Sequence, residues 1–274
     1  MKLVAALVVS QCDDLKLTSK VLESLENQTD KEFSTIVLLN GFSEVPSLIT
    51  QKIRSLDISV IKNEKMMQFW EALNLLLSNC HKDDIFIRVD ADDICLPMRM
   101  EYTKQVFINS ENNKKIIYGD AIEVSRGGNK AKRDQVDVNK HFQNSKLSNP
   151  IVHSTVAFRV GDILENGGYP SFRRAQDLAL WLRLFKAKFD FIRIPFPLVE
   201  FQLPTNPRVS RGLRYFISEI QIYKFAYKIG YADLMSVIIA LSNKAFIRLL
   251  FSILPGSLTT RLIDDIIKHR HNKL

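Results

Sequence analysis

Apolar and polar positions alternate regularly along the first 120 residues of the chain. Short continuous apolar runs predict buried strands at residues 3–10, 33–39, 58–61, 84–89 and 116–119. Between these runs, apolar positions recur three or four residues apart and predict helices over residues 15–28, 66–80 and 97–109. This order is typical of an α/β fold with a mostly parallel sheet between helices, in which ligands bind beyond the carboxyl ends of the strands.

After residue 120 the pattern is less regular. Its predicted elements are a polar loop or irregular hairpin over 125–146, strands over 149–159 and 191–199, a turn over 167–170 and a helix over 177–188. We therefore place one domain at residues 1–205, with halves at 1–120 and 121–205, and a separate tail at 206–274.

The tail is helical, apolar and basic by its pattern. Helices are predicted over 213–229 and 234–254, and the second is interrupted by polar residues, so it falls short of the roughly 20 apolar residues that cross a bilayer. Lys244 and Arg248 share one helix face, and residues 268–273 form a basic cluster. An amphipathic basic helix can lie on an anionic membrane surface. Packing against the rest of the chain, or pairing in a homodimer, is the alternative.

Charge and cysteine usage narrow the class of protein. The net charge is +8, and residues 205–274 hold 11 Lys/Arg against 4 Asp/Glu, so the excess belongs to the apolar tail rather than to an aromatic-interleaved basic stripe. This argues against nucleic-acid binding. Three cysteines without C-x-x-C spacing, and no visible signal peptide, favour a reducing cytoplasm over a disulfide framework or a structural zinc site.

Three carboxylates follow the apolar run at 85–89, namely Asp90, Asp92 and Asp93. Crowded carboxylates repel unless a cation lies between them. Oxygen ligands without a neighbouring histidine suit Mg²⁺ or Mn²⁺, which commonly share their coordination shell with substrate phosphates. The alternative is a solvated acidic turn that ends a strand.

Several segments in this order resemble a family 2 glycosyltransferase of the GT-A fold, of the type that builds bacterial cell-surface polysaccharides such as O-antigen or capsule. The resemblance covers about residues 3–205. The matching segments are Val8-Val9-Ser10, Leu22 to Thr29, Ile36 to Gly41, Ile61 to Glu64, Glu71 to Asn74, Arg88 to Arg99, Asn149 to Ser154, Gly167 to Tyr169 and Gln176 to Arg183.

The resemblance implies an inverting transferase whose donor is a nucleotide-diphospho sugar, with UDP favoured. Residues 1–120 would bind the donor, and residues 121–205 would carry the acceptor side. Asp90 and Asp92 would hold Mg²⁺ or Mn²⁺ against the diphosphate, and Asp177 would be the general base that deprotonates the acceptor hydroxyl. Expected substrate contacts are Ser10, Gln11, Asp13, Asn40, Asn63, Arg88, Asp90, Ala91, His153 and Gln176.

The resemblance further implies a polyprenyl-diphosphate-linked saccharide as acceptor, and a peripheral location on the inner face of the cell membrane. Three departures affect the site, and one of them is Gln68, where the family often has Gly. Leu39-Asn40 stands where the family usually has Asp-Asp, and Gln176 stands where it usually has Glu. A degenerate, non-catalytic GT-A protein is therefore one alternative. A sugar nucleotidyltransferase is another, although residues 10–14 lack the glycines and basic residues usual in its first loop.

Overall fold

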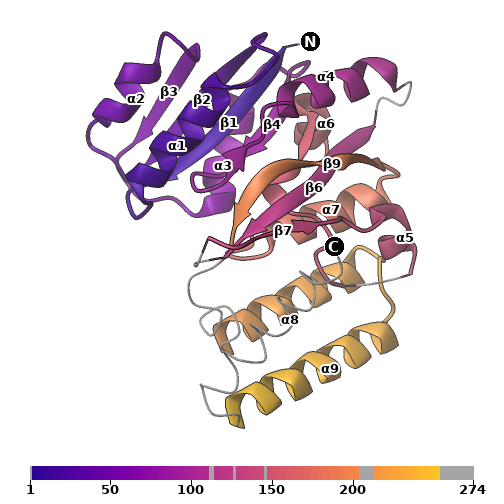
Figure 1. Ribbon diagram of the computed structural model, residues 1–274. Coiled ribbons are helices and arrows are strands. Elements are labelled where there is room, and N and C mark those ends of the chain that lie inside the picture. Colours follow the sequence, from indigo (N-terminus) through magenta and orange to yellow (C-terminus); the bar gives the residue numbers. More distant parts are fainter. Residues whose placement is uncertain (1, 111–113, 126–127, 145–146, 204–212, 254–274) are drawn as a thin grey trace.

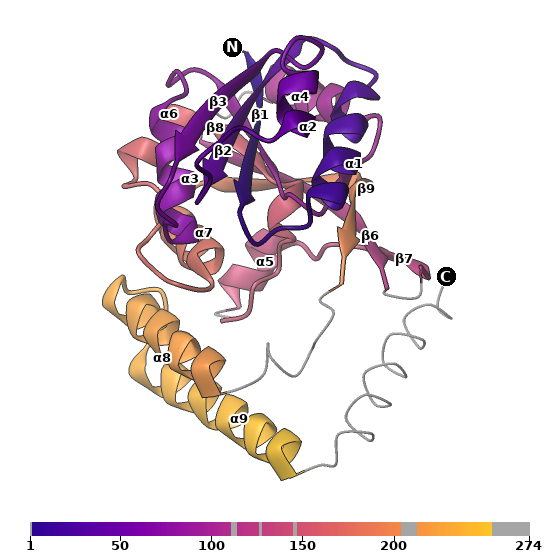
Figure 2. The same cartoon turned by 90° about the vertical axis from the view of Figure 1, so that its left-hand side faces the viewer.

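A computed structural model describes residues 2–110, 114–125, 128–144, 147–203 and 213–253 (Figures 1 and 2). Its sheet has the strand order β3-β2-β1-β4-β8-β6-β9-β5, with β7 paired to β6. The strands are β1 Leu3–Ser10, β2 Phe33–Asn40, β3 Ile58–Asn63, β4 Ile85–Val89, β5 Ile94–Cys95, β6 Lys115–Val124, β7 Lys130–Arg133, β8 Ala157–Arg159 and β9 Asp190–Gln202. The helices are α1 Leu15–Glu26, α2 Ser47–Lys52, α3 Phe69–Ser78, α4 Arg99–Asn109, α5 Val138–Gln143, the 3-10 turn η1 His153–Thr155, α6 Val160–Glu165, α7 Gln176–Lys186, α8 Leu213–Lys228 and α9 Leu234–Ile253.

The four predicted N-terminal strands are confirmed, and β1 to β4 run parallel. Successive residues of a strand point to opposite faces, so a strand buried on both faces is apolar throughout. In β1, Val4, Ala6 and Val8 belong to the core beneath α3 and α7. Leu3 and Leu7 belong to the core beneath α1 and α4 on the opposite face. The continuous apolar runs of the sequence reflect this two-sided burial.

The predicted helices of the first half are also present, with shifted ends. The Asp14 side chain accepts a hydrogen bond from the Lys16 N–H at 2.9 Å and caps α1. Helix α3 begins at Phe69 rather than at residue 66, because Gln68 and Glu71 form a capping box. The short elements α2 and β5 were not expected from the sequence.

The strand predicted over 149–159 is wrong for most of its length. Ile151 and Val152 are both buried, and the chain then turns through η1, with the Thr155 N–H donating to the Val152 carbonyl at 3.0 Å. Only β8 enters the sheet, antiparallel between β4 and β6. An apolar run buried on all sides has the same pattern whether it extends or turns.

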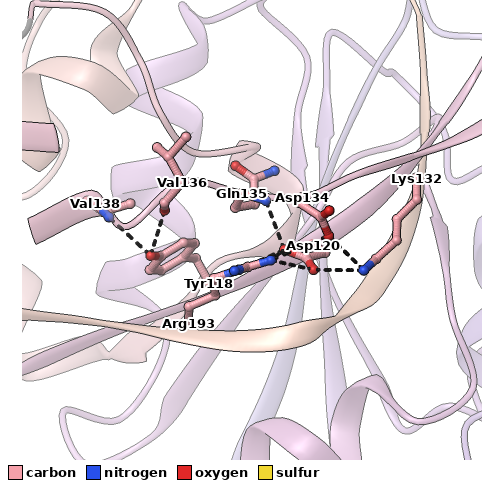
Figure 3. A network of polar contacts seen from close by, with 8 residues as sticks. All are labelled: Tyr118, Asp120, Lys132, Asp134, Gln135, Val136, Val138 and Arg193. Carbon is pink, nitrogen blue, oxygen red and sulfur yellow. Dashed lines mark hydrogen bonds and ion pairs between the residues drawn. The ribbon is translucent and has the colours of Figure 1, made fainter. Parts of the chain in front are cut away.

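The polar segment expected as a loop or irregular hairpin contains both a hairpin and a helix. Strand β7 pairs antiparallel with β6, and α5 follows it. A polar network holds the segment between them (Figure 3). Buried Asp120 receives the Gln135 N–H at 2.9 Å and both Nε and Nη2 of Arg193, at 2.9 and 2.8 Å. The Tyr118 hydroxyl donates to the Val136 carbonyl at 2.9 Å.

Helices α8 and α9 form a hairpin at the end of the molecule away from β1–β3 (Figures 1 and 2). The Tyr231 hydroxyl donates to the Phe142 carbonyl at 3.1 Å, and buried side chains of α8 extend the core beneath α7. Lys244 lies 3.5 Å from Glu219 of α8, so its charge is directed at the hairpin partner. No helix within the described ranges is both long and apolar enough to span a bilayer. The basic cluster at 268–273 lies outside the described residues.

Candidate active site at the carboxyl ends of the strands

Polar residues predicted to bind substrate line up where β1, β2 and β3 end. The strand register pairs Ser10 with Asn40 and Asn40 with Asn63. Backbone hydrogen bonds continue past the strands, from the Gln11 N–H to the Asn40 carbonyl at 3.0 Å and from the Gly41 N–H to the Asn63 carbonyl at 2.7 Å. The sheet therefore brings these side chains to one edge, as the alternating pattern predicts.

The side-chain amides of Asn40 and Asn63 form hydrogen bonds with the backbone of the protein. Asn40 donates to the Met67 carbonyl at 3.1 Å and accepts from the Met67 N–H at 2.8 Å, and it is only 2% exposed. The Asn63 amide donates to the Lys65 carbonyl. Both residues thus shape the loop before α3. Leu39 points to the opposite face, into the core beneath α1, so the family's first acidic position is filled by a core residue.

Three carboxylates crowd the end of β4. The Asp13 carboxylate accepts the Ser10 N–H at 2.7 Å, and burial raises its pKa, with a smaller contribution from Asp90. Asp92 is exposed to solvent, yet desolvation and then the charge of Asp90 raise its pKa to about 6. Asp13 acts on Asp92 in the same sense. Their mutual repulsion marks a place where a cation would be stabilised.

Asp93 differs from its neighbours because it points into the protein. It is 2% exposed, and it accepts hydrogen bonds from the Ser154 hydroxyl and from the Gln202 N–H, the latter at 3.0 Å. Desolvation first, and then the charge of Asp90, raise its pKa to about 8. Asp93 therefore joins the acidic loop to η1 and to the end of β9.

Arg88 is a buried ion-pair partner of Asp90. Its guanidinium forms an ion pair with the Asp90 carboxylate, lies 5.1 Å from the centre of the Phe69 ring, and is 1% exposed. Ala91 offers its carbonyl to the Thr18 hydroxyl at 3.3 Å. The substrate contacts expected for Arg88 and Ala91 stay predictions. Because Arg88 is buried and paired with Asp90, it would affect a bound ligand by positioning the Asp90 carboxylate.

The donor set fits a divalent cation that shares its shell with a ligand. Within the described part of the chain, no three His, Cys, Asp or Glu side chains gather into a complete metal site. Asp90 and Asp92 supply hard carboxylate oxygens, and Asp13 adds negative charge beside them. Mg²⁺ typically takes one or two protein carboxylates and completes its shell with phosphate and water. Two carboxylates are therefore a donor set for a cation that arrives with a phosphate ligand.

Asp177 lies in the first turn of α7, where Ala175 adopts a left-handed conformation with φ of 54° just before the helix. It is half-buried, and its Oδ2 accepts a hydrogen bond from the Asn149 amide at 2.5 Å. Gln176, beside it, is 8% exposed. A carboxylate at a helix N-terminus is favoured by the helix dipole.

His153 lies in η1, and the charges of both Asp90 and Asp177 act on it. Its Nε2 is 2.9 Å from the Tyr169 hydroxyl, and burial, followed by the charge of Arg88, lowers its pKa. Asp177 and Asp90 both act on this imidazole in the opposite direction. Carboxylates 87 positions apart in the sequence therefore both act electrostatically on one histidine.

Tyr169 is a site residue to which the sequence assigned no role. Asn74 of α3 accepts the Tyr169 N–H at 2.7 Å and donates to its carbonyl at 2.9 Å. Gly168 has φ of 66°, and a Cβ there would lie 2.5 Å from the Asn74 Oδ1, so only glycine fits. The Gly-Gly-Tyr sequence was the available signal, because paired glycines mark special backbone conformations.

The chain is similar in sequence to known glycosyltransferases. The family description "Glycosyl transferase family 2" matches residues 8–163. The UDP-Gal:alpha-D-GlcNAc-diphosphoundecaprenol beta-1,3-galactosyltransferase of Escherichia coli is 28% identical over 250 residues, which cover 89% of this chain and 90% of that enzyme.

Solved structures extend the likeness to the fold. S. aureus TarS, residues 1–349 in complex with UDP-GlcNAc, has a TM-score of 0.65 at 15% identity and covers 90% of this chain and 73% of its own. The mannosyltransferase PcManGT from Pyrobaculum calidifontis, in complex with GDP-Man and Mn2+, has a TM-score of 0.61 at 14% identity and covers 97% of this chain and 80% of its own. These likenesses confirm the α/β GT-A fold class predicted from the sequence.

Proposed function

The chain belongs to glycosyl transferase family 2, and on that premise we propose that it transfers a sugar, with inversion, from a UDP-sugar to a polyprenyl-diphosphate-linked saccharide. The product would be an intermediate of a bacterial cell-surface polysaccharide. The E. coli relative, whose name specifies a UDP-sugar and a diphosphoundecaprenol acceptor, supports this choice, and so does the likeness to TarS in complex with UDP-GlcNAc.

The observation that carries the proposal is the presence of two separately held carboxylates, Asp90 in its ion pair with Arg88 and Asp177 in its hydrogen bond with Asn149. Asp90 directly follows β4, at the edge of the sheet where a donor diphosphate would lie, and Asp177 lies in the first turn of α7. Both act on the His153 imidazole. A transferase needs this separation, because one group must hold the leaving phosphate while another accepts the proton of the attacking hydroxyl.

Asp90 and Asp92 are the residues that would hold Mg²⁺ or Mn²⁺. The cation, when bound, offsets the negative charge that grows on the departing nucleoside diphosphate. PcManGT in complex with Mn2+ supports this assignment by likeness of fold. Arg88 keeps the Asp90 carboxylate in position from the buried side.

On the acceptor side, Asp177 takes the proton of the acceptor hydroxyl as that oxygen attacks the anomeric carbon. His153, kept neutral by burial, offers hydrogen bonding without a competing positive charge. Ser10, the last residue of β1, would flank the nucleotide together with Gln11 and Asp13, which follow it. Asn40 and Asn63 shape that pocket through the loop before α3.

Peripheral membrane contact through the α8–α9 hairpin completes the proposal. Exposed apolar side chains gather around its turn: Tyr227, Leu234, Met235, Ile238 and Ile239. Exposed Lys224 and Lys228 lie on the same hairpin. Apolar side chains beside lysines are suited to an anionic lipid surface, where a lipid-linked acceptor would be found.

The decisive experiment measures nucleoside diphosphate release from a panel of nucleotide sugars, with and without divalent metal. We expect slow metal-dependent hydrolysis of one UDP-sugar, and fast release once a diphosphate-lipid saccharide is added. Asp92→Ala and Asp177→Asn should each remove transfer, whereas Asp83→Asn, a change at an exposed carboxylate outside the site, should not. Full turnover in EDTA, or pyrophosphate as the product, would contradict the proposal.

A further inference from the structure

We infer that Asn149 is a positioning residue for Asp177, holding the Oδ2 of that carboxylate so that Oδ1 is presented to the acceptor hydroxyl. The inference rests on the proposed function, in which Asp177 is the general base. It starts from one contact, the hydrogen bond of 2.5 Å from the Asn149 Nδ2 to the Asp177 Oδ2.

The orientation of the Asn149 amide is set by a second contact. Its Oδ1 accepts the Ile151 N–H at 3.2 Å, which leaves the Nδ2 directed at Asp177. Oxygen and nitrogen of an amide are assigned from such networks, and here one neighbour is a backbone donor and the other a carboxylate acceptor. Both contacts agree on a single assignment.

The backbone around Asn149 is restrained as well. Pro150 follows it, and a residue before proline is held in an extended conformation. Ile151 and Val152, which follow Pro150, are each 4% exposed. Ile151 packs into the core beneath α3 and α7, and Val152 packs into the core beneath α1 and α4. The chain then enters η1, which carries His153. One short anchored segment thus supplies both the residue that holds Asp177 and the imidazole beside it.

A neutral amide is chemically suited to this task. A lysine or arginine in its place would form an ion pair and make the carboxylate a weaker base. An amide donor orders the carboxylate and favours its charged form without cancelling the charge. The other groups that bear on this region are Arg88 and Asp90 from β4, together with His153 and Tyr169.

The contacts of Asn149 also bear on Gln176, which stands where the family usually has Glu. If the geometry of Asp177 is fixed by Asn149, the residue preceding it in α7 does not need to carry a carboxylate. The departure from the family's Glu-Asp pair then leaves the base in place.

The test compares Asn149→Ala with Asn149→Asp in the full chain, by steady-state kinetics from pH 5.5 to 9 with a saturating UDP-sugar. Asn149→Asp keeps an acceptor for the Ile151 N–H but replaces the donor by a like charge. We expect kcat to fall about 10- to 100-fold in both variants, and the donor KM, from a separate series with varied UDP-sugar, to stay within twofold. In the pH profile of kcat/KM for the acceptor, the acid limb should move to higher pH because the carboxylate loses a hydrogen-bond donor. The shift should be about one unit in Asn149→Ala and larger in Asn149→Asp.

The matched control is Asn139→Asp. Asn139 makes a similar pair of backbone contacts with Phe191, donating at 2.9 Å and accepting at 3.3 Å, away from the site. It should lower the thermal midpoint without moving the acid limb. If Asn149→Ala does not fold, the kinetics of Asn149→Asp alone test the positioning role, because that variant retains the contact with the Ile151 N–H.

Two outcomes separate this inference from the proposed function. If Asp177→Asn retains transfer, Asp177 is not the general base, and both the proposed mechanism and the positioning role of Asn149 are overturned. If Asp177→Asn is inactive while the Asn149 variants keep the wild-type acid limb and lose no more activity than Asn139→Asp, only the positioning role is overturned.

Discussion

Replacing Asp92 by asparagine should stabilise the metal-free protein while removing metal-dependent transfer. In the folded chain the pKa of Asp92 is raised from 3.8 to about 6, first by desolvation and then by Asp90. Two pKa units correspond to roughly 3 kcal/mol of unfavourable free energy for the charged form. Because Asp92 is exposed, solvent screening reduces this figure to about 1 kcal/mol.

The pH dependence of this gain follows from the two pKa values. Between pH 4 and pH 6, folded Asp92 retains a proton that the unfolded chain has released, so wild-type stability falls as the pH rises through this window. Above about pH 6 Asp92 is charged in both the folded and the unfolded chain, and its destabilising effect on the folded protein is at its maximum. The substituted asparagine carries no charge, so the stability gain of Asp92→Asn should grow from pH 4 to pH 6 and then stay constant.

Urea unfolding in EDTA, followed by circular dichroism at pH 4.5 and pH 7.5, measures this difference. With a urea slope of about 3 kcal/mol per molar, the midpoint should rise by roughly 0.3 M at pH 7.5 and by less at pH 4.5. Asp83→Asn serves as the surface control. A variant that is less stable than wild type at pH 7.5, or equally stabilised at both pH values, would refute the repulsion argument and with it the reason to place a cation there.

Three further outcomes follow from the contacts of the site. Gly168→Ala should cost about 2–3 kcal/mol in urea unfolding, because the left-handed backbone and the 2.5 Å approach to the Asn74 Oδ1 both oppose a Cβ; an unchanged midpoint would contradict this. Arg99→Met should cost about 2 kcal/mol, because the buried guanidinium donates to the Ser154 carbonyl and its removal leaves that oxygen unpaired; a neutral effect would show that the oxygen finds another donor. The His153 imidazole should titrate below pH 6.5 by nitrogen-detected NMR, because burial and then Arg88 lower its pKa, and a midpoint above 6.5 would reverse the charge assigned to it.

The half of the site nearest the strands could be predicted because its signal is local. Runs such as residues 3–9 and 85–87 are apolar because they are buried on both faces, and the polar residues that follow them fall at one edge of a parallel sheet. The positions of Ser10, Asn40 and Asp90 follow from that rule alone. Their assignment to a sugar transferase depended on the family resemblance, which carries chemical information that periodicity lacks.

Only the tertiary structure decided what each polar side chain contacts. Asn40 turns to Met67, Asp93 turns inward to Ser154, and Asn149 reaches Asp177, in each case because a partner distant in sequence is brought within hydrogen-bonding distance. Hydrophobic burial depends on the period of a pattern, so it can be read along the chain. Hydrogen bonds depend on distances of about 3 Å between specific atoms, and these exist only once the strands and helices are packed.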